Sequence, residues 1–389
     1  MTSDATPHEP FLLTPGPLTT TRATKEAMLR DWGSRDGEFI AMNARVRRRL
    51  TELVHGDGSH VCVPLQGGGT FIVEAMIGTL VPPPGKLLVL VNGAYGRRMV
   101  RICEYYRRAC AVQEVAEDRP VDPAALDAAL AADPGITHVV VVHCETTSGV
   151  LNPVEAIAAV AARHRRRLLI DAMSAFGAIP LDARRVPFDA LVASANKCLE
   201  GVPGVGFAII RREALDEARG QAPSLSLDLY DQWAAMEKTG QWRFTPPTHV
   251  IAALDRALDQ HAAEGGVAGR GARYHRNCRV LVEGLRAMGF ETLLPDRLQA
   301  PIIVTVRMPA DPRFHFETFY ERLGRRGYVI YPGKLTAADS FRIGCIGALG
   351  EPEMRGVLDA IREVVAELGV QSTAAAGRPQ GGRDALDPR

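Results

Sequence analysis

The stretch SANKCLEGVPG, residues 194–204, places one lysine, Lys197, between small residues and a turn rich in glycine and proline. Lysine is rare here, with five lysines among 46 basic residues. Unlike arginine, a lysine in an apolar setting can lose its proton and act as a nucleophile. A structural salt bridge is the alternative, although arginine, which this chain prefers elsewhere, would form one equally well. We therefore interpret Lys197 as a candidate nucleophile.

A carboxylate, Asp171, ends the apolar run RLLID, twenty-six residues before Lys197. Both residues follow short apolar runs that we interpret as consecutive strands of a parallel sheet, and the carboxyl ends of such strands face one ligand crevice. A carboxylate at this position is costly to bury unless it meets a cation. Taken alone, Asp171 is better explained as a cap of the following turn.

A glycine run opens the predicted helix in QGGGTFIVEAMIG, residues 66–78, with Gly68, Gly69 and Thr70 at its start. Free N–H groups at a helix N-terminus bind anions, and glycines let a phosphate approach closely. The segment is neither a P-loop nor a dinucleotide-binding fingerprint, because it lacks the residues that define them. An ordinary tight turn before a helix is the alternative.

Two further motifs lie toward the C-terminus. Arg342 sits in the apolar run SFRIG, where a buried guanidinium needs an anionic partner such as a carboxylate or phosphonate ligand, or an internal salt bridge. The segment GQWRFTPPTH holds Trp242, Arg243 and Thr245, a combination that suits a ligand lid or a subunit contact.

Together these motifs predict a site for pyridoxal 5′-phosphate. Its aldehyde bonds a lysine, its ring nitrogen needs a carboxylate to stay protonated, and its phosphate needs hydrogen-bond donors. Lys197, Asp171 and the glycine run supply these groups, and Arg342 adds an anion-binding group for the substrate. No metal site is predicted.

The elements that must position these residues follow a strand–helix–strand pattern. Short β-branched runs predict buried strands at 86–93, 138–145, 167–174, 189–197 and 204–211, and Ala/Leu-rich segments between them predict helices. This alternation favours a parallel α/β sheet. After residue 250, long helical patterns precede runs typical of antiparallel strands, which favours a smaller α+β domain.

Length and composition predict two domains in this 389-residue chain. We expect a flexible arm at 1–10, a large domain at 11–250 whose N-terminal segment packs on the small domain, a small domain at 251–370 and a disordered tail at 371–389. The net charge of +1 does not favour nucleic-acid or membrane partners. Seven scattered cysteines without a C-x-x-C pair, no signal-peptide pattern and no apolar run of about 20 residues predict a cytoplasmic protein.

The chain resembles the class V aminotransferases, which are pyridoxal-phosphate enzymes of fold type I. The resemblance runs from LLTPGPLTT to EVVAELG and includes VNGAYGRR, IDAMSAFGAIPLD and SANKCLEGVPGVGF. The stretches SLSLDLYDQW and WRFTPPTH point within the class to the 2-aminoethylphosphonate–pyruvate transaminases. The implied fold is a large domain with a mainly parallel seven-stranded sheet flanked by helices, plus a smaller α+β C-terminal domain.

The resemblance also implies roles for individual residues. Lys197 would form the Schiff base with the cofactor and Asp171 would pair with the pyridinium nitrogen. Of the other cofactor-binding positions, Tyr95 would lie against the ring, Thr146 near the ring hydroxyl, and Thr245 would reach the phosphate from the neighbouring subunit of a homodimer. Arg342 would hold the substrate carboxylate or phosphonate, and Gly16, with Pro15, would line the entrance. The implied reaction converts 2-aminoethylphosphonate and pyruvate to phosphonoacetaldehyde and L-alanine, a step of phosphonate catabolism.

Three departures from the pattern concern the substrate rather than the cofactor. The phosphate loop reads GGGT where relatives have Gly-Ser-Gly-Thr, and CIGALG follows Arg342 where Asn-Ile-Gly-Glu is usual. The segment DWGSRDGEF differs from the acidic DxDY pattern expected at this place. An alanine–glyoxylate, serine–pyruvate or other aminophosphonate transaminase of class V is therefore the alternative. A cysteine desulfurase would need a nucleophilic cysteine in a late loop, and Cys345 falls in a strand pattern. A binding protein without activity would need to lack Lys197 or Asp171.

Overall fold

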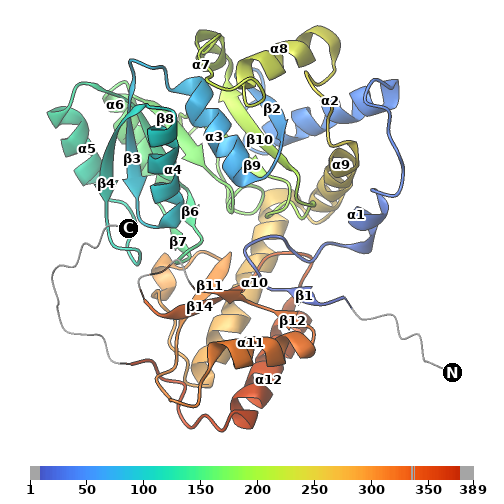
Figure 1. Ribbon diagram of the computed structural model, residues 1–389, viewed down its shortest axis with the longest axis vertical. Helices are drawn as coiled ribbons and strands as arrows, with labels where there is room; N and C mark the ends of the chain where they lie inside the picture. The colour runs from blue at the N-terminus through green and yellow to red at the C-terminus, as the bar shows by residue number, and fades with distance from the viewer. Residues whose placement is uncertain (1–8, 334–335, 337, 377–389) are drawn as a thin grey trace.

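The computed structural model describes residues 9–333, 336 and 338–376 (Figure 1). The arm expected at 1–10 and the tail expected at 371–389 lie largely outside these ranges. Within the tail, residues 371–376 are described, and Ala375 forms an antiparallel bridge with Pro309.

A seven-stranded sheet organises residues 22–263, which we call the large lobe. In spatial order its strands are β2 (His60–Gln66), β10 (Val205–Arg211), β9 (Ala190–Ser194), β8 (Arg167–Asp171), β5 (Ile136–Val142), β3 (Lys86–Val91) and β4 (Ala109–Glu114). All neighbours pair in parallel except β10, which is antiparallel to both β2 and β9. The predicted mainly parallel seven-stranded sheet is confirmed.

Helices cover both faces of this sheet, as Figure 1 shows. One face carries α3 (Gly69–Leu80), α4 (Ala94–Tyr105), α7 (Arg212–Glu217) and α8 (Leu229–Thr239). The other carries α2 (Gly37–Glu52), α5 (Pro123–Ala132), α6 (Val154–Arg163) and α9 (Thr248–Ala263), with the short α1 (Arg22–Glu26) against α9. Because successive strand side chains point to opposite faces, Leu87 and Val89 join one core and Leu88 and Leu90 the other.

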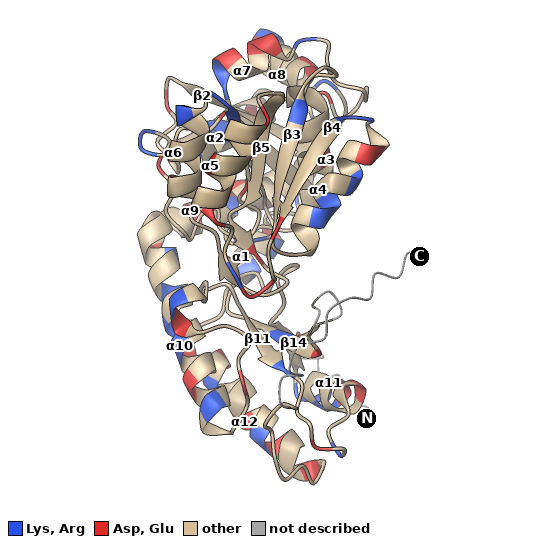
Figure 2. Ribbon diagram, turned by 90° about the vertical axis from the view of Figure 1, so that its left-hand side faces the viewer, with Lys and Arg blue, Asp and Glu red and all other residues tan. Residues whose placement is uncertain are grey.

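The small lobe comprises the N-terminal strand β1 (Phe11–Leu12) and residues 266–376. Its antiparallel sheet has the order β11 (Ile303–Arg307), β14 (Ser340–Gly344), β13 (Tyr331–Pro332), and β1 pairs with β12 (Tyr328–Val329). Its helices are α10 (Gly266–Ala287), α11 (Phe316–Arg325) and α12 (Glu351–Glu367), with a 3-10 turn η1 (Asp296–Leu298). Figure 2 shows α10 descending from the large lobe along the small one.

A short hairpin, β6 (Cys144–Glu145) with β7 (Val150–Leu151), follows β5 toward the small lobe.

The domain boundary expected at residue 250 falls inside α9, whose Ile251 and Leu254 pack in the large-lobe core. Helix α9 therefore packs with the large lobe, and the division of the chain into domains remains a prediction. None of the described helices is both long and apolar enough to span a membrane.

Candidate active site

A cavity of about 200 Å³ lies at the carboxyl ends of β8 and β9. Asp171 is the last residue of β8 and pairs with Val192 of β9, and Lys197 follows β9 after two residues. Both side chains line the cavity, so the expected neighbourhood of these two strand ends is present. The other predicted residues in its lining are Gly68, Gly69, Thr70 and Tyr95.

The amine of Lys197 is held from the N-terminal segment. Its Nζ donates a hydrogen bond to the carbonyl oxygen of Pro15. Gly16 adopts φ 125° and lies so close that an added Cβ would stand 2.6 Å from Lys197 Nζ, so a side chain at Gly16 would displace the amine. Burial lowers the pKa of Lys197 to about 8, and neutral, nucleophilic amine is therefore available near neutral pH.

The carboxylate of Asp171 is buried, with 4% of the residue exposed. Its Oδ1 accepts a hydrogen bond from Met173 N at 2.9 Å, and no ion pair among the described residues includes it. Burial raises the pKa of Asp171 to about 6. A cationic group bound in the cavity would therefore stabilise its charged form.

The opposite end of the cavity is built to hold an anion. Gly68 caps α3 through its backbone, and the first N–H groups of a helix have no partners inside it. Arg98 Nη1 donates to Thr70 Oγ1 at 3.0 Å. An added Cβ on Gly69 would meet Met173 Sδ at 2.8 Å, so this glycine keeps the cavity floor and the helix start in close contact.

Tyr95 and Arg98 reach the cavity from the first turns of α4. The Arg98 guanidinium lies 4.9 Å from the centre of the Tyr95 ring. Glu145 fixes the start of this helix, because its buried carboxylate accepts hydrogen bonds from Tyr95 N at 3.2 Å and from Thr147 Oγ1 at 2.7 Å. Burial raises the pKa of Glu145. The predicted aromatic ring is therefore present at the cavity, with a cation beside it.

Arg342 is buried on β14, with 1% exposed. Its Nη1 donates to Thr146 O and its Nη2 to Pro332 O, each at 2.9 Å, while its Nε has no partner. None of the ion pairs among the described residues includes it, so the internal salt bridge considered from the sequence is wrong there. Thr146, whose hydroxyl hydrogen-bonds Tyr95, lies between Arg342 and the cavity wall.

Thr245 lies apart from these residues in the single chain. It lines a separate cavity of about 490 Å³ with Gln66, Gly67, Phe71 and Phe244. Of the other predicted site residues, Gly16 and Thr146 contact residues of the cavity lining, and Arg342 lies behind Thr146. Lys197, Asp171, Gly68, Gly69, Thr70 and Tyr95 line the cavity itself.

Sequence reasoning missed other residues of the lining: Arg98, Met173, Asn196, Val73 and Pro203. Arg98 follows Tyr95 by three positions in a helix, a spacing that places both side chains on one face and that could have identified it. Asn196 is adjacent to the candidate lysine, but adjacency alone gives no direction. Glu145 had no usable signal, because its role depends on a turn that brings it to α4.

The comparisons with known proteins agree on one family. The model of the class V aminotransferase family matches residues 23–340. A protein of Burkholderia lata named 2-aminoethylphosphonate–pyruvate transaminase 2 is 56% identical over 94% of this chain and 98% of its own. The chain belongs to the class V aminotransferases. A Pseudomonas aeruginosa protein named 2-aminoethylphosphonate–pyruvate transaminase is 55% identical over 93% of this chain and 97% of its own.

Solved structures have the same fold. The pyridoxamine–pyruvate aminotransferase of Mesorhizobium loti superposes with a TM-score of 0.85 at 26% identity, covering 93% of this chain and 94% of its own. An alanine–glyoxylate aminotransferase of a Nostoc species gives a TM-score of 0.86 at 22% identity, covering 92% and 95%. This class V aminotransferase is thus a pyridoxal-phosphate-dependent enzyme of fold type I, as expected from the sequence.

The residues of the cavity fit pyridoxal phosphate. The buried carboxylate of Asp171 suits a protonated ring nitrogen, the start of α3 with Arg98 suits a phosphate, and the amine of Lys197 suits an aldehyde. The Tyr95 ring offers an aromatic surface between these ends. The chemistry of this donor set matches the three reactive parts of the cofactor.

Proposed function

We propose that this class V aminotransferase transfers the amino group of 2-aminoethylphosphonate to pyruvate, giving phosphonoacetaldehyde and L-alanine. The observation that carries the proposal is the similarity to curated transaminases of that name at 54–56% identity over more than nine-tenths of the chain. The site adds a chemical reason: the buried Arg342 has no carboxylate partner among the described residues and an unpaired Nε. A guanidinium can bind either a phosphonate or a carboxylate through two parallel hydrogen bonds.

The residues divide the work of holding the cofactor. Lys197 would bind it covalently, Asp171 would hold the proton on its ring nitrogen, and the N–H groups at Gly69 and Thr70 would bind its phosphate. When bound, pyridoxal phosphate supplies an aldehyde that takes up amino groups and a protonated ring that accepts electrons from the substrate carbon. Tyr95 would limit movement of the ring and exclude water from one of its faces.

Lys197 then acts as the base. Its Nζ, made partly neutral by burial, would remove the proton from the carbon that bears the substrate nitrogen and return a proton later in the turnover. The carbonyl of Pro15 accepts a hydrogen bond from Nζ and so orients the amine. Arg342 would hold the phosphonate of the donor and, in the second half of the reaction, the carboxylate of pyruvate. One anion site therefore serves both substrates.

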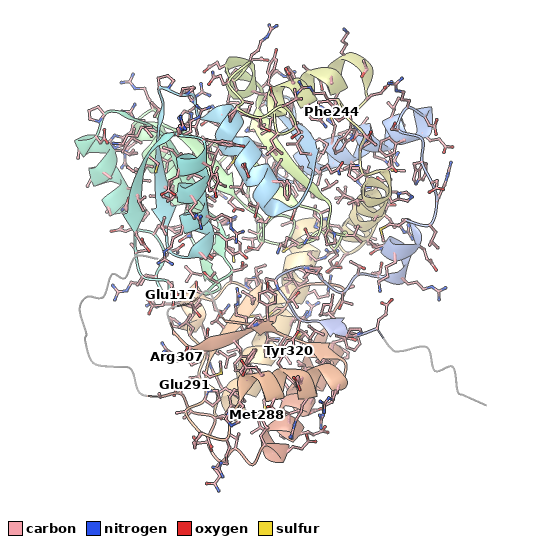
Figure 3. All side chains as sticks on the ribbon, in the orientation of Figure 1. Glu117, Phe244, Met288, Glu291, Arg307 and Tyr320 are labelled. Atoms are coloured by element: carbon pink, nitrogen blue, oxygen red, sulfur yellow. The ribbon has the colours of Figure 1, made fainter. Side chains whose placement is uncertain are left out.

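The dimer also belongs to this proposal. Phe71 is 55% exposed and Phe244 50% exposed, and both line the cavity that holds Thr245 (Phe244 is labelled in Figure 3). A second copy covering these rings would bury apolar surface and bring Thr245 toward the neighbouring site. Replacing Phe244 with Asp should give monomers in sedimentation experiments, whereas Tyr320→Asp on the small lobe should not.

A cytoplasmic location is supported by the seven cysteines, which are all free thiols.

A donor panel tests the proposed reaction. The purified holoenzyme is supplied with pyruvate and one of 2-aminoethylphosphonate, a longer aminophosphonate or L-serine, or with alanine and glyoxylate, and the amino-acid product is measured. We expect 2-aminoethylphosphonate to be the best donor and Lys197→Ala to be inactive. Turnover of serine or of alanine with glyoxylate, with 2-aminoethylphosphonate inert, would contradict the proposal.

Cys345 is fully buried in the small-lobe core, which disfavours a desulfurase.

A further inference from the structure

A buried cluster of charged residues lies behind the loop that carries Lys197. Glu200, three residues after the lysine, is 3% exposed and adopts φ 59°, a left-handed conformation that is unfavourable for a residue with a Cβ. Its N–H donates to Lys197 O at 2.8 Å and closes the turn that begins at the lysine. A strained backbone at a non-glycine residue persists only where surrounding contacts hold it.

Residues in the first turns of α10 supply those contacts to the side chain of Glu200. Its Oε1 accepts hydrogen bonds from Arg273 Nη2 at 2.7 Å and from the hydroxyl of Tyr274 at 2.5 Å. Arg270 Nη1 lies 3.4 Å from the same oxygen and donates to the carbonyl of Cys198, next to the lysine. The lysine loop is therefore tied to α10 through both a side chain and the backbone.

The same two turns of α10 hold the segment that follows Arg342. Arg273 Nη1 donates to the carbonyls of Gly347 at 2.5 Å and Leu349 at 2.8 Å, and the Tyr274 hydroxyl accepts from Gly347 N at 3.2 Å. Asn277 Nδ2 donates to Cys345 O at 3.0 Å. One guanidinium, that of Arg273, thus contacts the carboxylate behind the lysine and the backbone beyond the end of β14.

We propose that Glu200 and Arg273 form a positioning pair that sets the placement of Lys197 relative to Arg342. Neither side chain lines the cavity, so the pair acts through the two loops that it joins. The inference rests on the proposed function, since it assigns Lys197 to the cofactor and Arg342 to the substrate anion. It predicts that loss of the Glu200 carboxylate weakens donor binding more than turnover, because the anion site and the reacting amine lose their alignment.

The cluster contains a matched control. Glu264 pairs with the same two arginines, through Arg270 Nε at 2.6 Å and Arg273 Nε at 2.7 Å. It is 25% exposed at its side chain, and its recorded hydrogen bonds join it to neither the lysine loop nor residues 345–349. Glu264→Gln therefore removes one negative charge from the cluster but leaves the contacts of Arg273 with Glu200 and with residues 347 and 349 in place.

The test compares the variants Glu200→Gly, Glu200→Gln and Glu264→Gln as holoenzymes. Glycine relieves the left-handed backbone, so a residue needed only for the turn would give unchanged kinetics and an unchanged or higher Tm. The positioning role predicts instead a rise of about tenfold or more in KM for 2-aminoethylphosphonate, with a smaller change in kcat, equivalent to about 1.4 kcal/mol in binding. Glu200→Gln, which keeps an acceptor oxygen, should fall between, and Glu264→Gln should remain near the wild type.

Hydrogen exchange gives a readout that needs no substrate. In Glu200→Gly, amides of residues 195–205 and of residues 345–350 should both exchange faster, although the two segments lie in different lobes. Faster exchange confined to 195–205, or equal effects in Glu264→Gln, would overturn the proposal, as would KM within twofold of wild type. If Glu200→Gly does not fold, the exchange pattern of Glu200→Gln decides. If the wild-type enzyme does not convert 2-aminoethylphosphonate, the proposed reaction is wrong. The hydrogen-exchange comparison then still tests the positioning pair, because it uses no substrate.

Discussion

Two groups of charged side chains meet at the loop of residues 194–204. They differ in how many of their charges form ion pairs within the protein. On one side, no ion pair among the described residues includes Lys197, Asp171 or Arg342. On the other side, Glu264 and Arg273 form a close ion pair within a buried cluster. Glu200 and Arg270 of this cluster, at 3% and 1% exposed, are as deeply buried as Asp171 and Arg342, so burial alone does not explain the contrast.

The pKa shifts follow this difference. Burial lowers the pKa of Lys197 to about 8 and raises that of Asp171 to about 6, so both groups move toward their neutral forms. In the cluster, burial acts in the same sense, but hydrogen bonds and charges of Arg273 and Arg270 lower the pKa of Glu264 to about 2. Glu264 and Glu200 likewise raise the pKa of Arg273. Buried charged groups without an oppositely charged partner in the protein mark where ligands bind, and those in buried ion pairs mark where the chain stabilises its own structure.

After the loss of Lys197 itself, the largest effect is expected from Asp171→Asn. Loss of the carboxylate that holds the ring proton should lower kcat by about 10³-fold. Because burial raises the folded-state pKa of Asp171, its contribution to the free energy of unfolding falls as pH rises from about 4 to about 6. The cofactor-free variant should therefore be more stable than wild type above pH 6, by up to roughly 3 kcal/mol, and the difference should vanish toward pH 4.

Steady-state kinetics and denaturation of the cofactor-free proteins measure both parts. Asp182→Asn, which breaks a surface pair with Arg184, is the control and should change neither. An Asp171→Asn variant that is inactive and also less stable at pH 8 would show that this carboxylate is structural.

Arg273 and Arg342 belong to different groups, and their loss should have different effects. Arg273→Met should lower the free energy of unfolding by about 3–5 kcal/mol, because it removes one of the two arginines that pair with the buried Glu200 and with Glu264. Arg342→Met should leave the stability of the cofactor-free protein within about 1 kcal/mol of wild type and raise KM for the donor by about 30- to 100-fold. Urea denaturation and kinetics test both, with the exposed Arg313→Met as reference. Equal destabilisation by Arg342→Met would remove the contrast between the two groups.

The pH dependence of Lys197 gives the smallest but sharpest effect. In the cofactor-free protein, the fraction of neutral amine should rise about tenfold per pH unit up to pH 8 and then level off. The depressed folded-state pKa also means that this lysine's contribution to the free energy of unfolding rises with pH between about 8 and 10.5. Amine labelling followed by peptide mapping measures the midpoint, with the exposed Lys238 on α8 as the reference in the same samples.

Much of the large lobe could be predicted because its signals are local. Apolar runs bounded by turns gave β3, β5, β8, β9 and β10, and the strand-end positions of Asp171 and Lys197 followed from them. The antiparallel direction of β10 was not predicted, although the short connection of residues 195–204, with no crossover helix, is a usable sign.

What the sequence could not supply depends on contacts between distant segments. Glu200 was part of the first motif considered, but its partners Arg273 and Tyr274 lie more than 70 residues later on α10. Arg342 was chosen correctly as a buried cation, yet only the three-dimensional structure shows which of its hydrogen bonds are made by the protein. The boundary predicted at residue 250 rested on a change in the sequence pattern, which says nothing of the packing of α9 on the large-lobe sheet.

The most direct test of the incomplete charge group is to fix the cofactor where it binds. Reduction of the holoenzyme with borohydride, followed by peptide mapping, should place one pyridoxyl group on Lys197 and none on the other four lysines. Lys197→Ala should carry no label and show no transamination. A label on another lysine, or transamination that persists in Lys197→Ala, would contradict the account.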